Sequence, residues 1–417
     1  MLYRHAKFLQ QVLYHSITAF GGPQAHYGMM HRTFVQKTPY ITDDELLDFN
    51  ALCSILPGAS STQILTLIGY KRGGVLLATI TLLIWLTPAC ILMGALSFVV
   101  KYVAPGQAMS VFKVVQPMAI GFLLYASYNA TIFIKKNTIV YVLISITTIL
   151  IFLFFKYPLI FPLLIILSGV VTNISKRRFP QNDTVVKAIR WNNLYFFIAI
   201  LIVTGICSEA SRRYQWNETV RKPLNLFENT YRMGSYVFGG GQVLIPVMES
   251  QFSERNEQIN FSKRNPNAIS IPQTDFYTGA GIVRAIPGPV FSIAAFTGGL
   301  AMRNKGITWQ LLGIVIGTVA IFLPSVLLVL FFYPIWHNLK KYAVVYRALE
   351  GINAAVVGIM LGSSIYMVQD VLHTVHTNTY LLTINVITML ATVLLLQCTR
   401  IPAPILVIIA LVFGFIL

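Results

Sequence analysis

The sequence predicts an all-α integral membrane protein, a polytopic helical bundle of about 12–13 apolar segments built from two inverted-topology repeats with broken or re-entrant helices. Three observations predict this class. Only 11% of the 417 residues are charged and 56% are hydrophobic, whereas a soluble protein carries roughly 25% charged residues. Apolar stretches of about 20 residues recur from end to end, which favours spanning helices over barrel strands. Helix-breaking Gly and Pro motifs also occur twice, once in each half.

The apolar segments follow one another with short polar connections, and each is expected to be helical because lipid offers no partner for backbone polar groups. Three of them, 8–30, 50–69 and 275–302, contain Gly and Pro in their interiors, so we expect half-helices or re-entrant hairpins there. The full set is 8–30, 50–69, 74–100, 109–134, 138–155, 157–174, 194–210, 231–250, 275–302, 306–336, 342–369, 379–397 and 401–417.

Two motifs recur in both halves at a nearly constant spacing. Phe20-Gly21-Gly22-Pro23-Gln24 returns as Phe238-Gly239-Gly240-Gly241-Gln242, an offset of 218 residues (238 minus 20). Leu56-Pro57-Gly58 returns as Ile286-Pro287-Gly288, an offset of 230 residues (287 minus 57). Further matches in the same order are Gly69 with Gly299, Pro88 with Pro324 and Lys113 with Arg347. An ordered series of this kind predicts an internal duplication.

The start of one helix also recurs. Thr42 followed by Glu45 has the spacing of a capping box, in which the two residues satisfy free amides at a helix N-terminus. Thr274-Asp275-Phe276 is expected to open the matching helix of the second half.

The duplication divides the chain into a first repeat at 1–175, a basic loop with a connector helix at 176–225, and a second repeat at 226–417. The relative orientation of the repeats depends on segment 194–210. If that segment crosses the membrane, the second repeat is inverted, and if it does not, the repeats are parallel. We favour the crossing because 194–207 is almost unbroken apolar sequence.

The net charge of +17 comes from Lys and Arg that lie mostly in short loops. Cytoplasmic-side bias and anionic lipid explain such a distribution in a membrane protein, so we expect lipid and no nucleic acid as a partner. An electrostatic funnel for anions is a compatible second use. The four cysteines are far apart in the chain. We therefore expect neither a metal site nor a cofactor.

The first candidate binding element is Pro57-Gly58. A helix that restarts at this proline inside the membrane presents free N–H groups and a positive dipole end, which together attract an anion. Ser60, Ser61, Thr62 and Gln63 then place hydroxyl and amide groups in the first turns. The competing interpretation is a plain proline kink whose hydroxyls bond back to the backbone.

The second candidate element is Pro287-Gly288-Pro289, which lacks most of these donors but follows Arg284 by three residues. An Arg in the middle of an apolar segment costs roughly 2.5–3.5 kcal/mol on insertion, so it is expected to face a cavity and a partner. Its rigid fork of donors suits an oxyanion. The alternative is an Arg that reaches an interface or pairs with Asp275 or Glu249.

The glycine elements and three titratable residues complete the candidates. The glycines allow close backbone approach or a positive φ, and the glutamines add amide donors, although close helix packing explains the same pattern. These predicted substrate-binding residues are Gly21, Gly22, Pro23, Gln24, Gly240, Gly241 and Gln242, to which His26 is added. His31 and Glu249 align under the 218 offset and are candidates for proton coupling.

Missing motifs narrow the function. The chain has no Walker A sequence and no paired intramembrane carboxylates, which disfavours ATP hydrolysis and cation transport. The residues favour a secondary transporter of a tetrahedral oxyanion. Sulfate or another anion, such as an organic acid, is an alternative cargo. Passive channels and membrane enzymes that act on lipid phosphates are more distant alternatives, and no nucleophile–base pair supports the enzyme.

These motifs resemble those of the chromate ion transporter family over essentially the whole chain. The resemblance implies a non-enzymatic, multi-pass protein of the cell membrane with two homologous domains of opposite topology. It also implies chromate efflux driven by an electrochemical gradient. As partners we expect chromate or a sulfate-like oxyanion, membrane lipid and a second copy of the chain (a homodimer). The family's motif residues carry over onto Gly21, Gly22, Pro23, His26, Pro57, Gly58, Gln63, Gly240, Gly241, Pro287, Gly288 and Pro289. The copies differ in having Ala59 against Pro289, and Pro23 against Gly241.

Overall fold

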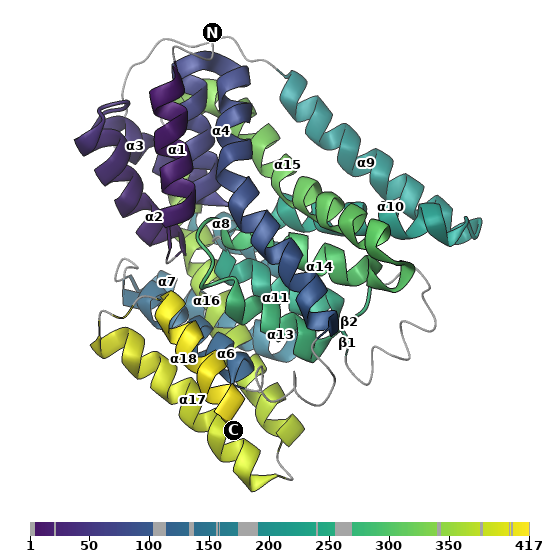
Figure 1. The fold of residues 1–417 in the computed structure, drawn as a ribbon. Coiled ribbons are helices and arrows are strands. Elements are labelled where there is room, and N and C mark those ends of the chain that lie inside the picture. Colours follow the sequence, from purple (N-terminus) through teal and green to yellow (C-terminus); the bar gives the residue numbers. More distant parts are fainter. Residues whose placement is uncertain are drawn as a thin grey trace.

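The computed structural model is almost entirely helical, as the composition predicts (Figure 1). The residues that it describes are 5–20, 22–102, 114–132, 137–155, 157, 159–173, 191–238, 241–254, 269–339, 343–375, 378–399, 401 and 403–416.

The first repeat begins with a broken helix, as the Gly-Gly-Pro motif predicts. Helix α1 ends at Thr18 and α2 begins at Gly22, so the expected segment 8–30 is two helices. The elements of this repeat are α1 (Ala6–Thr18), α2 (Gly22–Met30), the π-helix η2 (His31–Lys37), α3 (Asp43–Ile55), α4 (Ser60–Tyr102), α6 (Val115–Ile132), α7 (Thr138–Phe154) and α8 (Ile160–Thr172).

The second repeat has the same break, since α10 ends at Tyr236 and α11 begins at Gly241. A two-residue parallel pairing of β1 (Ser253–Glu254) with β2 (Ile271–Pro272) precedes its third helix. The elements after α8 are α9 (Asn192–Arg213), α10 (Glu218–Tyr236), α11 (Gly241–Phe252), α13 (Gln273–Ile282), the 3-10 helix η3 (Val290–Ser292), α14 (Ile293–Met302), the 3-10 helix η4 (Arg303–Lys305), α15 (Ile307–Leu339), α16 (Ala343–Val375), α17 (Thr379–Cys398) and α18 (Ala403–Ile416).

The lengths and compositions of these helices fit a membrane protein. Within the described part of the chain, 5 helical stretches are long and apolar enough to cross a bilayer. They are Ser60–Val100, Asn192–Arg213, Ile307–Trp336, Glu350–His373 and Thr379–Cys398. Four shorter helices are also apolar, and large side chains such as Ile91, Leu153 and Ile206 are exposed on the outer faces. Such surfaces suit lipid rather than water.

Helix α9, the predicted connector, runs along the outside of the bundle beside α10 and α15 (Figure 1). Only 6% of its apolar window is buried, and it is one of the stretches long enough to cross. By length and composition α9 could therefore cross a membrane, while the crossing itself and the inversion of the second repeat that depends on it stay predictions.

Each repeat contains a helical hairpin closed by a glycine. Helix α4 is interrupted at Gly73-Gly74, where Gly74 has φ 69°, and its two arms fold together, since Gly69 lies against Ala78 and Thr81. In the second repeat Gly306, with φ 102°, joins α14 and η4 to α15. Such positive φ values favour glycine because other residues have a Cβ that clashes.

The same hairpins carry a duplicated acid–base pair. Lys71 at the tip of the first hairpin pairs with Glu45 in the first turn of α3. Arg303 at the tip of the second pairs with Asp275 in the first turn of α13, with Nη1 and Oδ2 2.6 Å apart. The predicted capping box of Thr42 and Glu45 is confirmed, whereas α13 begins at Gln273, one residue before the predicted Thr274.

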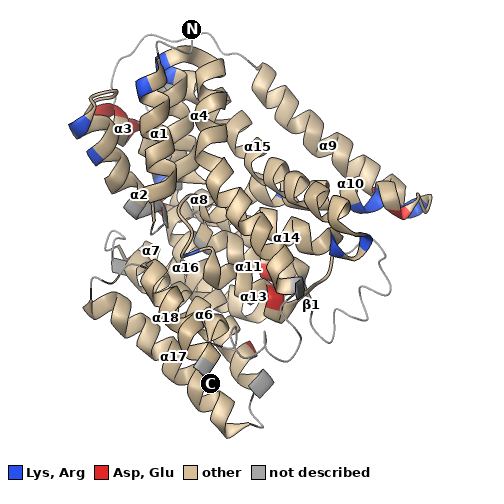
Figure 2. Ribbon diagram, in the orientation of Figure 1, with Lys and Arg blue, Asp and Glu red and all other residues tan. Residues whose placement is uncertain are grey.

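The C-terminal helices of the two repeats pack across each other in a reciprocal pattern. Helix α16 packs on α7 and α8 of the first repeat, while α6 packs on α17 and α18 of the second. Glycines allow the close approach, since Gly351 lies on the Ser168 carbonyl and Gly358 on Ile144. Figure 2 shows that Lys and Arg gather near helix ends and loops, while the central lengths of most helices carry no charge. The core of the bundle therefore lies between the repeats.

Candidate functional site

Each repeat donates one backbone hydrogen bond to the other from its Pro-Gly turn. The Gly58 N–H donates to the carbonyl oxygen of Val237 at 2.7 Å, and the Gly288 N–H donates to that of Ala19 at 2.9 Å. Ala19 and Val237 directly follow α1 and α10, where terminal carbonyls lack a partner within the helix. The two repeats therefore satisfy each other's free backbone groups by one reciprocal exchange.

The conformation of the turns corrects one detail of the sequence prediction. Gly58 has φ 114° and Gly288 has φ 112°. A residue with positive φ cannot lie in a right-handed helix, so α4 begins at Ser60 rather than at Pro57. In the second repeat Pro289 precedes the 3-10 helix, and α14 begins at Ile293. Pro57 and Pro287 thus shape the turns that precede the helices.

Close packing across the repeats explains why both turns contain glycine. A Cβ on Gly58 would lie 2.4 Å from the Ser325 Oγ, and a Cβ on Gly288 would lie 2.8 Å from the Ala89 Cβ. Ala89 and Ser325 each follow a matching proline, Pro88 and Pro324, inside the long helices. The junction is therefore symmetric in the positions that pack together as well as in its hydrogen bonds.

The first turns of α4 supply polar groups next to this junction. No hydrogen bond is made by the backbone N–H of Ser60, Ser61 or Thr62 to other described residues, as expected for the first amides of a helix. The Thr62 Oγ1 accepts a hydrogen bond from the Trp85 Nε1 at 3.0 Å. The Gln63 Nε2 donates to the Pro57 carbonyl at 2.8 Å, while its Oε1 is buried without a partner among the described residues. The proline kink with back-bonded hydroxyls therefore describes this segment only in part.

The second repeat offers a hydroxyl that the sequence reasoning missed. Ser292 is fully buried, and its Oγ has no hydrogen-bond partner in the described part of the chain. The signal was available, because the offset of 230 that relates Pro57 to Pro287 also relates Thr62 to Ser292 (292 minus 62). Helix N-termini also meet here, since a Cβ on Gly241 at the start of α11 would lie 2.4 Å from Val290 in η3.

Arg284 lies in the turn that follows α13, three residues before Pro287. Its side chain is half-buried and forms no hydrogen bond or ion pair with any described residue. The alternative in which it pairs with Asp275 is wrong, because that carboxylate accepts from Arg303. The Glu249 carboxylate accepts instead from the Gln273 Nε2 at 3.4 Å. The Arg284 guanidinium, three residues before Pro287, thus has no partner among the described residues.

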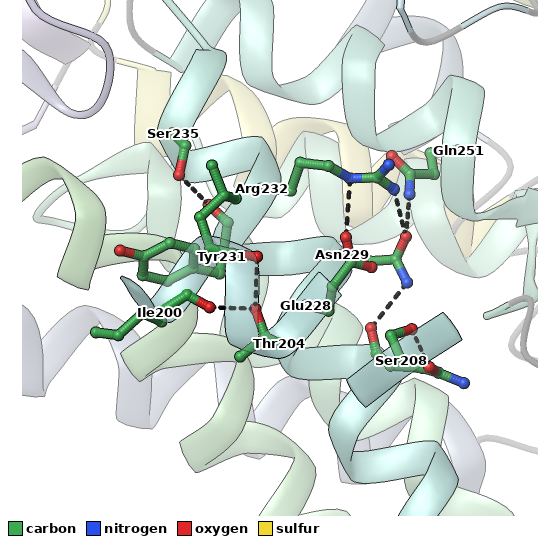
Figure 3. Close-up of polar contacts among 11 residues, drawn as sticks. Ile200, Thr204, Ser208, Glu228, Asn229, Tyr231, Arg232, Ser235 and Gln251 are labelled. Atoms are coloured by element: carbon green, nitrogen blue, oxygen red, sulfur yellow. Dashed lines mark hydrogen bonds and ion pairs between the residues drawn. The ribbon is translucent and has the colours of Figure 1, made fainter. Parts of the chain in front are cut away.

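A second arginine, Arg232, contrasts with Arg284 because its side chain has several partners (Figure 3). Arg232 on α10 pairs with Glu228 at 3.3 Å and donates to the Asn229 Oδ1 at 2.8 Å. Gln251 from α11 donates to the same Asn229 oxygen. The charge of Arg232 is thus neutralised by its own neighbours, which makes this cluster a structural link between α10 and α11.

Several predicted residues contribute less to the described geometry. Gly22, Pro23 and Gln24 open α2, and Gly241 and Gln242 open α11, whereas Gly21 and Gly240 lie outside the described residues. His31 is partly exposed, and its Nε2 lies 2.5 Å from the Asp43 Oδ1. Glu249 is fully buried beside Gln273. The His31 side chain thus lies beside Asp43 and the Glu249 side chain beside Gln273, whereas Gln63 donates to the Pro57 carbonyl of the first Pro-Gly turn.

His26 lies on α2 and is 1% exposed. Its ring meets that of Trp85 edge-on, with 5.4 Å between centroids. A second histidine, His15 on α1, stacks on the same indole at 5.3 Å. Sequence reasoning missed His15 because a single histidine in an amphipathic helix has no motif around it.

The chain is similar to known transporters along most of its length. The model of the family described as "Chromate transporter" matches residues 6–173 and 224–415. A "Chromate transport protein" of Cupriavidus metallidurans is 23% identical over 359 residues, which cover 84% of this chain and 79% of the relative. A "Probable chromate transport protein" of Synechococcus elongatus is 22% identical over 406 residues, covering 95% and 91%.

An uncharacterized transporter of Methanocaldococcus jannaschii is 23% identical over 359 residues, covering 84% of this chain and 81% of the relative. No solved structure shows a significant match. The family match spans most of both halves of the chain. This multi-pass helical membrane protein belongs to the chromate transporter family.

Proposed function

We propose that the protein is a secondary active transporter that exports a tetrahedral oxyanion, chromate, and holds it between the repeats at Pro57-Gly58 and Pro287-Gly288. The single observation that carries this proposal is the reciprocal bonding of Gly58 to Val237 and of Gly288 to Ala19. It ties the broken helices of both halves to one buried junction. Broken helices at a repeat interface are the usual setting of a binding site in secondary transporters.

The chemistry around the junction suits an anion with several oxygens. The first amides of α4 and the positive end of its dipole attract negative charge without a charged side chain. The hydroxyls of Ser61 and Ser292 can donate further hydrogen bonds, and the fork of Arg284 can take two oxygens at once. These groups come from both repeats, and the site is therefore complete only when the repeats are together.

The duplicated fold supports an alternating-access mechanism. In this proposal the repeats 1–175 and 226–417 are inverted and are joined by 176–225, so the hairpin tips at Gly74 and Gly306 face opposite sides of the cell membrane. The Glu45–Lys71 and Asp275–Arg303 pairs would then lie on opposite sides too. A rocking motion of one repeat against the other exposes the same site to each side in turn.

The relatives from Cupriavidus metallidurans and Synechococcus elongatus are named for chromate transport, which supports chromate over other tetrahedral anions. Sulfate has the same shape and charge, so it is the natural competitor. The protein acts in this proposal without a cofactor, within the lipid of the plasma or inner membrane.

The experiment is transport into proteoliposomes that contain the purified protein and an imposed proton or potential gradient. Labelled chromate, sulfate and molybdate are supplied in parallel. We expect chromate to accumulate against its own gradient, with sulfate as a competitor. Flux that only equilibrates chromate would identify a passive channel, and preferred accumulation of sulfate would identify a sulfate carrier. No flux of any oxyanion would refute the proposal.

A further inference from the structure

Two buried histidines flank one tryptophan beside the junction of the repeats. The His15 ring stacks on Trp85 with 5.3 Å between centroids and 23° between planes, while the His26 ring meets it at 5.4 Å and 89°. Both histidines are 1% exposed. By hydrogen-bond geometry the Nε2 of His15 and both ring nitrogens of His26 lack a partner among the described residues, and the polar group beside the His26 ring is the backbone of Ala19. Buried polar atoms without partners are rare and need an explanation.

Neighbouring residues link this cluster to both Pro-Gly turns. Trp85 donates its Nε1–H to Thr62, in the first turn after Gly58. Ala19, which lies between the two histidines in the chain, accepts the hydrogen bond from the Gly288 N–H. A change at the cluster can therefore reach the first turn through Thr62 and the second turn through Ala19.

The neighbours of the cluster carry little charge. From η2 the contacting side chain is Phe34, whose ring lies 5.5 Å from that of His15. From α4 the side chain that contacts both histidines is Trp85. The turn at 286–289 contributes no titratable side chain. Arg72, which follows Lys71 at the hairpin tip, lies over Tyr40 and Phe8, and Phe34 contacts both of these rings and that of His15. No carboxylate of the described residues bonds to either imidazole.

We propose that His15, Trp85 and His26 form a binding site for one proton, which couples proton movement to the transport of the oxyanion. The inference rests on the proposed function. One imidazole can take the proton, because the face of Trp85 stabilises a stacked cation. The second imidazole then stays neutral, because two like charges in a buried site repel each other strongly. The pair has no counterpart in the second repeat, where Met233 and Leu244 occupy the positions that are 218 residues further on.

The first test is the tryptophan fluorescence of the purified protein, titrated from about pH 3 to pH 8 around the ordinary imidazole pKa. Circular dichroism follows the helix content. We expect a reversible fluorescence change in the native protein that Trp85→Phe removes and that the matched control Trp336→Phe retains. His15→Gln and His26→Gln should each shift its midpoint, while the exposed-histidine control His373→Gln should not. A titration that is unchanged in both His15→Gln and His26→Gln would overturn the proposal, because core histidines with a packing role alone would give that result.

The second test separates coupling from transport in proteoliposomes. We expect His15→Gln to retain oxyanion counterflow at equal pH on both sides, and to lose about tenfold or more of the accumulation driven by a pH gradient. Full gradient-driven accumulation by His15→Gln would contradict the coupling role. Absence of counterflow in the native protein would instead refute the proposed function, and the fluorescence titration would still decide whether the cluster binds a proton.

Discussion

The backbone N–H of Gly58 donates a 2.7 Å hydrogen bond to the carbonyl oxygen of Val237, which lies in the other repeat. Its symmetric counterpart joins Gly288 to Ala19. A net contribution of about 1 kcal/mol is typical for one such bond, so two of them cannot lock the repeats permanently. They can define one arrangement that is released during a transport cycle.

The conformation of these glycines leads to the first prediction. Gly58→Ala and Gly288→Ala should each destabilise the protein by about 1–3 kcal/mol, because alanine disfavours the positive φ at both sites. The added Cβ would also clash with Ser325 or Ala89. Thermal unfolding of the purified variants measures the loss. Gly205→Ala is the matched control, since nothing lies within 4 Å of that position. Equal stability of Gly58→Ala and Gly205→Ala would contradict the geometry.

The contrast between two arginines leads to the second prediction. Arg284→Ala should abolish transport while the unfolding temperature stays near that of the native protein, because Arg284 has no partner among the described residues to lose. Arg284→Lys should retain the charge but bind the oxyanion more weakly, because the bidentate fork is lost.

Arg232→Gln should lower stability, in contrast to Arg284→Ala. It leaves the Glu228 carboxylate unpaired and half-buried, so stability should fall. Adding Glu228→Gln should restore stability, and the double variant should still transport. Normal transport by Arg284→Ala would remove Arg284 from the site.

The hydroxyl groups lead to the third prediction. Ser292→Ala, and the combined change of Ser60, Ser61 and Thr62 to Ala, should each weaken oxyanion affinity, by about tenfold for each 1.4 kcal/mol of lost binding energy. Ser250→Ala in α11 is a control, because the Ser250 Oγ bonds to the Val247 carbonyl of its own helix. An unchanged affinity in the first two variants would exclude these hydroxyls as ligands.

The duplicated acid–base pairs lead to the fourth prediction. A double-mutant cycle on Asp275 and Arg303 should give a coupling energy of about 1 kcal/mol, the upper end for such pairs, because both side chains are only 20–23% exposed. The pair of Glu209 and Arg212 is 51–61% exposed and serves as the control. A coupling at Asp275 and Arg303 no larger than the control would show that the hairpin tip is not held by this pair.

The pH dependence of the other pair gives the fifth prediction. Burial raises the pKa of Glu45, but the hydrogen bonds from Lys71 and Thr42 outweigh burial and hold that pKa below its ordinary value. Glu45 therefore adds stability above its unfolded-state pKa, about 4.3, and this contribution is lost as the pH falls through the lowered pKa. The stability difference between the native protein and Glu45→Gln should shrink on acidification below about pH 4. A constant difference from pH 7 to pH 3 would contradict this role.

Much of the fold follows from local chemistry that the sequence displays. The paired Gly-Gly and Pro-Gly motifs lie inside apolar segments, so the breaks before α2 and α11 and the turn at Gly58 could be predicted, although single prolines such as Pro88 and Pro324 lie inside continuous helices. Thr42 and Glu45 display their capping box directly. The start of α4 at Ser60 could not be predicted, because it depends on the positive φ of Gly58, which packs closely against Ser325 of the other repeat.

The sequence displays the donors of the junction, Gly58 and Gly288, but not its acceptors. Its acceptors are the carbonyls of Ala19 and Val237, and a backbone carbonyl looks the same in every residue. His15 was equally hidden, because only the tertiary fold brings it to Trp85. Ser292 could have been predicted as a site residue, because the repeat offset of 230 that relates Pro57 to Pro287 also pairs it with Thr62.

The most direct test of the central claim is the binding of chromate to the purified protein, measured by isothermal titration calorimetry for the native chain, Arg284→Ala and Ser292→Ala. We predict saturable binding to the native protein, which sulfate displaces, and at least about tenfold weaker binding to each variant at unchanged thermal stability. Equal affinity in all three proteins, or no saturable binding to the native chain, would contradict an oxyanion site between the repeats.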